Sequence, residues 1–123
     1  MNSLNSILLE GNLTADPEIR STPNGTEVLT FSIGNNRSYK VNDEYVQEAS
    51  FFNVEVWGRL ATACANNLSK GRGVRVVGRL KQDRWTDEYG AKRSKVKIVG
   101  EHVEFKPIVK KESAAEPAET VTV

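Results

Sequence analysis

The chain has 123 residues, of which 38% are hydrophobic, so its length and composition predict one domain with a modest core. Its 17 Lys and Arg nearly balance its 16 Asp and Glu, yet ten of those basic residues lie between Lys70 and Lys97. A single cysteine excludes an intramolecular disulfide and a multi-cysteine metal site, and the lack of a signal-peptide pattern or long apolar run favours a cytoplasmic protein.

The first third of the chain predicts two strands. Residues 7–13 form an apolar run of strand length, which ends before Asp16-Pro17 and a turn signal at residues 22–25. From Val28 the sequence alternates, so one face should be buried by Leu29, Phe31 and Ile33. Residues 35–44 are polar and predict the end of this strand and a loop.

The next predicted strand, residues 51–57, carries aromatic rings on both faces. If Phe52, Val54 and Val56 face the core, Phe51 and Trp57 point outward. A strand that shows two large rings on its polar face needs a reason, because soluble proteins rarely expose such pairs. Two explanations of these outward rings are open at this point: stacking on bases and contact with another subunit.

Gly58–Lys70 is the only convincing helix in the sequence. Leu60, Cys64 and Leu68 recur every four residues, and Gly71 follows as a plausible C-terminal stop. On that apolar stripe, Cys64 is interpreted as a small buried hydrophobe and not as a nucleophile.

The basic segment predicts a hairpin with one cationic face. The alternation along its first strand puts three cations and one ring on the same face: Arg75, Arg79, Lys81 and Trp85. The opposite face carries Val74, Val76 and Leu80. After a turn at residues 87–90, the return strand places Arg93, Lys95 and Lys97 on one face. Cations beside a stacking ring suit single-stranded nucleic acid, although a solvated basic strand in which Trp85 fixes a turn is the alternative.

The element order is about three strands, one short helix and two further strands. A mainly all-β fold of this size removes its sheet edges most simply as a barrel, and a five-stranded Greek-key barrel with a long β-hairpin arm fits the order. Residues 1–106 form the predicted barrel domain. Residues 107–123 are rich in Lys, Glu, Ser, Ala, Pro and Thr and predict a disordered polar tail.

The candidate binding residues are four rings and a set of cations. The rings, as stacking platforms, are Tyr39, Phe51, Trp57 and Trp85. The cations would pair with phosphates in a salt-dependent way: Arg37, Lys40, Arg59, Lys70, Arg79, Lys81, Arg84, Arg93 and Lys95.

Nothing in the sequence points to an enzyme, a cofactor or a bound metal. The lone His102 lies among Glu101, Val103 and Glu104, and a structural role is preferred to that of a general base. Asp87 and Glu88 are interpreted as turn residues. Residues 71–73 (Gly-Arg-Gly) are too short for a phosphate-binding loop and follow a helix.

Several short motifs resemble one family in order. The opening NSILLEGNL at residues 5–13 and DPEIR at residues 16–20 resemble the first strand of bacterial single-stranded DNA-binding proteins. Further motifs extend the resemblance over about residues 3–105: Pro23–Gly25, Trp57–Ala61, Leu68–Gly71, Val77–Leu80 and Arg84–Asp87 with Gly90.

The resemblance implies an oligonucleotide-binding barrel and a homotetramer. It also implies sequence-independent binding and protection of single-stranded DNA, without catalysis, in replication, recombination and repair. The family's four stacking rings fall on the four named above, and its basic contacts fall on Arg59, Lys70, Lys81 and Arg84. Phe52 matches a position at the family's subunit contact.

Two further expectations concern partners. The family's tail usually ends in an acidic tip closed by a bulky hydrophobic residue, which recruits replication and repair enzymes, whereas residues 119–123 read ETVTV. Replication and repair proteins stay open as partners, although this sequence lacks the acidic hydrophobic tip that usually recruits them. The resemblance implies a cytoplasmic, nucleoid-associated protein. The alternative is a barrel of the same ancestry that serves as a primosome or accessory protein-interaction module with weak DNA binding.

Overall fold

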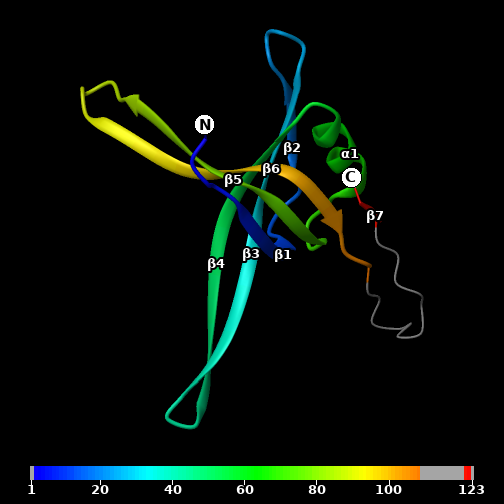
Figure 1. Cartoon of the computed structure of the whole chain (residues 1–123), viewed down its shortest axis with the longest axis vertical. Helices are drawn as coiled ribbons and strands as arrows, with labels where there is room; N and C mark the ends of the chain where they lie inside the picture. Colours follow the sequence, from blue (N-terminus) through cyan, green and yellow to red (C-terminus); the bar gives the residue numbers. More distant parts are fainter. Residues whose placement is uncertain (1, 109–120, 123) are drawn as a thin grey trace.

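The computed structural model describes residues 2–108, 121 and 122 (Figure 1). These described residues form seven strands and one helix, α1. In chain order the elements are β1 Ile7–Leu13, β2 Glu18–Ser21, β3 Glu27–Val41, β4 Glu44–Trp57, α1 Arg59–Asn67, β5 Gly73–Thr86, β6 Lys92–Phe105 and β7 Val121–Thr122.

Five of these strands close into the expected barrel. The hydrogen-bonded order is β1, β5, β6, β4 and β3, and β3 pairs back onto β1. The closing pair joins Asn12 to Gly34 and Leu13 to Ile33, while the parallel β4–β6 pair is equally short. The other neighbours are antiparallel, and β2 adds to the outer edge of β3. The prediction of a five-stranded Greek-key barrel is confirmed.

Gly11 makes the close crossing of β1 over β3 possible. A Cβ atom at this position would meet the Cγ2 atom of Ile33 and the carbonyl oxygen of Gly34. Only a residue without a side chain fits there, because packed interiors leave no room for an added methyl group.

The barrel is filled by the aliphatic rows that the sequence predicts, together with the inner face of α1. Cys64 of that helix is fully buried, and this burial raises the pKa of its thiol to about 12. The interpretation of Cys64 as a core residue is confirmed. The other fully buried side chains include Leu29, Ile33, Val56, Ala61, Val74, Val76, Val103 and Phe105.

The helix is shorter than predicted. It ends at Asn67, and Leu68 is extended while its N–H donates to the carbonyl of Cys64 at 2.8 Å. Leu68 is only 6% exposed, so its burial accompanies the end of the helix. Gly71 has a positive φ of 90°, but it lies in the following loop and does not cap the helix.

The prediction of a strand end and loop over residues 35–44 is wrong. The β3 strand continues to Val41, and β4 begins at Glu44 after a two-residue turn in which Asn42 and Asp43 have φ of 50° and 67°. Positive φ at both positions is the geometry of a tight hairpin. The segment is polar because it extends beyond the barrel as a two-stranded ribbon with both faces in water (Figure 1).

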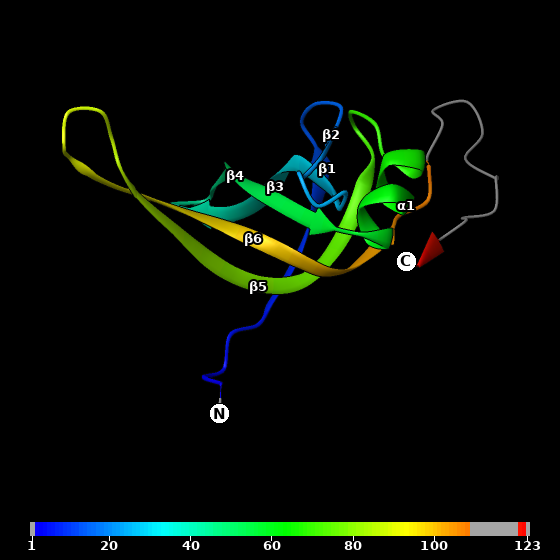
Figure 2. The same cartoon turned by 90° about the horizontal axis from the view of Figure 1, so that it is seen from above.

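The β5–β6 hairpin forms the predicted arm. A register shift at Val77/Gly78 marks its departure from the barrel, and the arm curves away from the barrel in Figure 2. Leu80 is 44% exposed, so its predicted place in the buried row is wrong. The buried row of β5 ends before Leu80 because the strand has left the barrel core at that position.

The expected tail, residues 107–123, falls mostly outside the described residues. Residues 109–120 and 123 are not described, so the predicted disorder stays a prediction. Val121 and Thr122 pair with Phe105 and Glu104 at the end of β6. In the part of the chain that is described, no helix is long and apolar enough to cross a membrane.

Candidate nucleic-acid interface

Three of the four predicted rings are open to solvent. Phe51 is 66%, Trp57 44% and Trp85 48% exposed. Alternation along β4 places Phe51 and Trp57 on one face, six residues apart, whereas Val54 and Val56 face the core. Phe52 was expected in that buried row, but it is 40% exposed because β4 is leaving the barrel at this point.

Tyr39 lies on the β3–β4 ribbon, on a different face from the other rings. It pairs with Val46, and directly opposed residues of an antiparallel pair share a face. Phe51 has the other parity on β4, which it shares with Tyr45. Tyr45 is 78% exposed, and the Lys40 ammonium lies 6.0 Å from its ring centroid. Sequence reasoning missed Tyr45, which lies between the predicted loop of residues 35–44 and the predicted strand of residues 51–57, where no element was expected.

The arm has the predicted basic face. Trp85 opposes Arg93, and Lys81 opposes Lys97, so these four side chains share one face of the ribbon. Asp83 and Lys95 oppose each other between them on the same face. Arg84 opposes Ser94 on the other face.

Arg84 is therefore separated from Trp85, its neighbour in sequence. Its guanidinium donates to the Oε1 atom of Gln82 at 2.9 and 3.2 Å. A shallow hollow in the arm is lined by Arg84 and Trp85 together with Gln82, Thr86, Lys92, Arg93 and Ser94.

Four of the nine predicted cations lie near carboxylates. Arg93 is 3.0 Å from Asp87, and the longer pairs of 3.7–3.9 Å join Lys40 to Asp43, Lys81 to Asp83 and Arg79 to Glu101. Exposed pairs of this kind contribute little stability, so a phosphate can replace the carboxylate. The other five have no carboxylate partner among the described residues: Arg37, Arg59, Lys70, Arg84 and Lys95.

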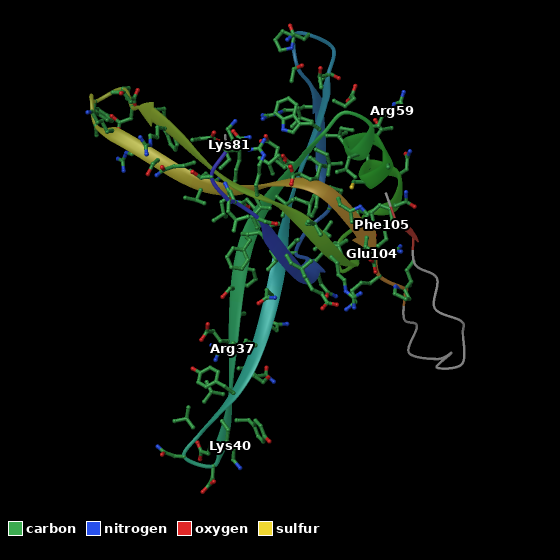
Figure 3. The ribbon with its side chains drawn as sticks, in the orientation of Figure 1. Arg37, Lys40, Arg59, Lys81, Glu104 and Phe105 are labelled. Carbon is green, nitrogen blue, oxygen red and sulfur yellow. The ribbon has the colours of Figure 1, made fainter. Side chains whose placement is uncertain are left out.

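The nine cations do not form one cluster. Figure 3 shows Lys81 where the arm leaves the barrel, Arg59 at the start of α1, and Arg37 and Lys40 far along the β3–β4 ribbon. Lys70 precedes β5 at the opposite end of that strand from the arm. It lines a separate hollow there with Arg72 and Lys106.

The ring-bearing face of β4 and the basic face of the arm meet at Lys97. The Lys97 ammonium lies 2.7 Å from the Oε2 atom of Glu55 and 2.8 Å from the Oδ2 atom of Asp83. The other oxygen of Glu55 accepts the indole N–H of Trp57 at 2.7 Å. A single chain of contacts therefore joins β4, β6 and β5.

The contacts at this junction favour the ionised forms of Lys97 and Asp83. Burial lowers the pKa of Lys97, but its hydrogen bonds to Asp83 and Glu55 outweigh that effect and raise it overall. The hydrogen bond from Lys97 likewise lowers the pKa of Asp83. Glu55 is only 5% exposed, and its two oxygens are paired with the Trp57 indole and the Lys97 ammonium.

An open cleft of about 430 Å³ lies beside the junction. Its lining combines the loop after β1, the outer side of β3 and β4, and the base of the arm. The polar residues that reach it include Arg20, Thr30, Asn53, Glu55, Asp83, Lys95 and Lys97. The cleft runs between the two faces that carry the rings and the cations.

Asp87 and His102, which were considered from the sequence as possible catalytic residues, lie in a turn and in a strand of the arm hairpin. A hydrogen bond from Arg93, followed by those from the N–H groups of Ala91 and Tyr89, lowers the pKa of Asp87 and fixes the turn. His102 lies in β6 opposite Val77. Across the residues that the structure covers, no group of three or more His, Cys, Asp or Glu side chains is placed to hold a metal ion.

Comparison with known proteins matches residues 4–106 to the model of the single-strand binding protein family. A single-stranded DNA-binding protein of Aquifex aeolicus (strain VF5) is 45% identical over 101 residues, which cover 81% of this chain and 68% of the relative. One from Treponema pallidum (strain Nichols) is 39% identical over 105 residues, covering 85% and 59%.

A third relative, the single-stranded DNA-binding protein of Borreliella burgdorferi (strain B31), is 40% identical over 106 residues. The match covers 85% of this chain and 71% of that protein. The chain thus spans between 59% and 71% of the length of these three relatives. The matched part contains the whole barrel and the arm.

Proposed function

We propose, on the premise that this chain belongs to the single-strand binding protein family, that it binds single-stranded DNA without sequence preference. It is a binding protein and not an enzyme. The relatives named above are single-stranded DNA-binding proteins, and the general role of the family is to cover and protect such strands during replication, recombination and repair.

One observation carries this proposal: the ring-bearing face of β4 continues into the basic face of the arm through Lys97. Bases stack on Phe51, Trp57 and Trp85, because every base offers a π-face whatever its identity. Phosphates pair with cations along both ribbons, which makes the affinity dependent on salt. Tyr45 extends this stacking face toward the end of the β3–β4 ribbon, whereas Tyr39 offers a ring on the opposite face.

The protein assembles as a homotetramer in this proposal. Exposed apolar side chains on the single chain support it, since Leu8 on β1 is 78% exposed and Phe52 is 40% exposed. The family resemblance places Phe52 at a subunit contact, where this surface would be covered. A cytoplasmic location beside the nucleoid follows from the DNA ligand.

The test is a titration with oligothymidine, followed by tryptophan fluorescence. Stacking should quench Trp57 and Trp85, and the affinity should fall steeply between about 50 and 200 mM salt. The absence of quenching at low salt would refute DNA binding. Mass measurement in solution, with and without a long oligonucleotide, tests the tetramer separately, and a monomer that binds one strand would refute it.

A further inference from the structure

Glu55 is an unusual residue to find on a DNA-binding face. Its carboxylate is 5% exposed and lies on the same parity of β4 as Phe51 and Trp57. A negative charge there opposes the approach of phosphates. Buried ion pairs are weak contributors to stability, because the cost of removing the charges from water offsets their attraction. Stability alone therefore does not explain this carboxylate.

The geometry of the carboxylate explains it better. One oxygen accepts the Trp57 indole N–H at 2.7 Å, and the other receives the Lys97 ammonium at 2.7 Å. Glu55 and Trp57 are two residues apart on one strand, so the hydrogen bond draws the ring along the strand toward Glu55. An indole held at its nitrogen loses its freedom to rotate about both side-chain torsions.

Lys97 completes the arrangement from a different strand. Its ammonium is only 17% exposed and lies between Glu55 and Asp83, so two carboxylates already neutralise it. Lys95, two residues earlier on the same face of the arm, has no carboxylate partner within the described part of the chain. The two lysines are close neighbours, but only Lys97 is in direct contact with carboxylates, whereas Lys95 opposes Asp83 across the arm without such a contact.

We infer that Glu55, held by Lys97, is a positioning residue that fixes the plane of the Trp57 ring for base stacking. Lys97 is accordingly a structural cation and not a phosphate contact, and its bond to Glu55 ties the base of the arm to β4. This inference rests on the proposed function, because it assigns how one stacking ring of that site is oriented.

The first test isolates Trp57. The chain has two tryptophans, so Trp85→Phe leaves Trp57 as the only indole. In that background Glu55→Ala should reduce the near-ultraviolet circular dichroism and fluorescence anisotropy of Trp57. It should also weaken oligothymidine binding by about threefold to tenfold, a part of the roughly 5–150-fold that one stacked base represents. Glu55→Gln keeps an oxygen for the indole and should preserve the ring signals, even if the alanine variant unfolds.

A second background separates positioning from folding. With Trp57→Phe added, no indole is left to orient, so Glu55→Gln and Glu55→Ala should change the affinity for a fluorophore-labelled oligothymidine by less than about twofold. An equal loss of affinity in the backgrounds with and without Trp57→Phe would overturn the inference, as would ring signals that do not respond to Glu55→Ala. If the Trp85→Phe parent fails to bind oligothymidine at low salt, the proposed function is refuted instead. The circular dichroism and anisotropy of Trp57 would then still test whether Glu55 orients its ring.

The matched pair Lys97→Met and Lys95→Met tests the electrostatic part. Lys95→Met should lower the slope of log affinity against log salt by about 0.7, the value for one phosphate contact on a single strand. Lys97→Met should leave that slope unchanged and reduce the Trp57 quenching. A drop in slope for Lys97→Met equal to that for Lys95→Met would overturn the inference, because Lys97 would then contact phosphate.

Discussion

Trp85 allows the contribution of a single ring to be measured with little interference from folding. It lies on the arm, is 48% exposed and is absent from the barrel core. An indole side chain offers up to roughly 250 Å², so about 120 Å² is free to be covered, and at ~25 cal/mol per Å² full coverage yields ~3 kcal/mol. A base that covers one face of the ring should use about half of that area. Trp85→Ala should therefore cost about 1–3 kcal/mol, or roughly 5–150-fold in affinity.

The assay is an oligothymidine titration at one fixed salt concentration. Trp57 remains as the fluorescent reporter, and Trp85→Phe is the matched control because it keeps a stacking ring on the same backbone. We expect the phenylalanine variant to lie much closer to the parent than the alanine variant. The thermal unfolding midpoint should be the same for all three proteins, because the arm ring supports no core packing.

Two results would refute this reasoning. An unchanged affinity for Trp85→Ala would show that the arm ring does not stack on bases. A loss of affinity with a lowered unfolding midpoint would show that Trp85 acts through the fold, as in the alternative in which it fixes the turn.

Three further predictions concern the fold. Gly11→Ala should destabilise the barrel by about 1–3 kcal/mol, measured by urea unfolding, because the methyl group has no room against β3. Cys64→Ser should cost about 1–3 kcal/mol, since it places a polar hydroxyl in the apolar core, and thiol reagents should label native Cys64 only at the rate of unfolding. The Arg93 contact lowers the pKa of Asp87 in the folded state, so this carboxylate contributes stability above about pH 4 that is lost as the pH falls through its folded pKa. The difference in urea midpoint between the parent and Asp87→Asn should therefore shrink from about pH 5 to about pH 3, and a constant difference would contradict this.

The fold was predictable where one face of a strand is buried. Alternation at Leu29–Ile33 and Val54–Val56 identified the barrel strands, because the core imposes a period of two on the sequence. The same criterion failed for residues 35–44, where both faces of the ribbon are in water and no periodicity is imposed. The Asn42-Asp43 pair was the available signal, since both residues adopt positive φ in a tight turn.

The site was predictable in part for a similar reason. Phe51, Trp57 and Trp85 were identified by parity, which is local information. The junction of Glu55, Lys97 and Asp83 was not identified, because it joins the arm to β4, and Glu55 lies 42 residues from Lys97 in the sequence. Pairing register decides which of many possible charge partners meet, and no local pattern specifies it. Lys97 shows the same limit, because the sequence does not reveal whether a cation is already neutralised. The face of Arg84, by contrast, follows from its parity, which is opposite to that of Trp85.

The two narrow seams of the barrel have a mechanical consequence. In the described part of the chain, the backbone ladders that join a sheet of β1, β5 and β6 to a sheet of β2, β3 and β4 have only two residue pairs between β1 and β3 and two between β4 and β6. The shared core and the Glu55–Lys97 pair add side-chain contacts between the two sheets. Short ladders of this kind open at lower free energy than the long ladders within each sheet, so amide exchange at the seams should precede exchange elsewhere in the barrel. Trp57 belongs to one sheet and Trp85 to the other. A change in the angle between the two sheets would therefore change the distance between the two proposed stacking rings, which lie on the outside of the barrel and on the arm.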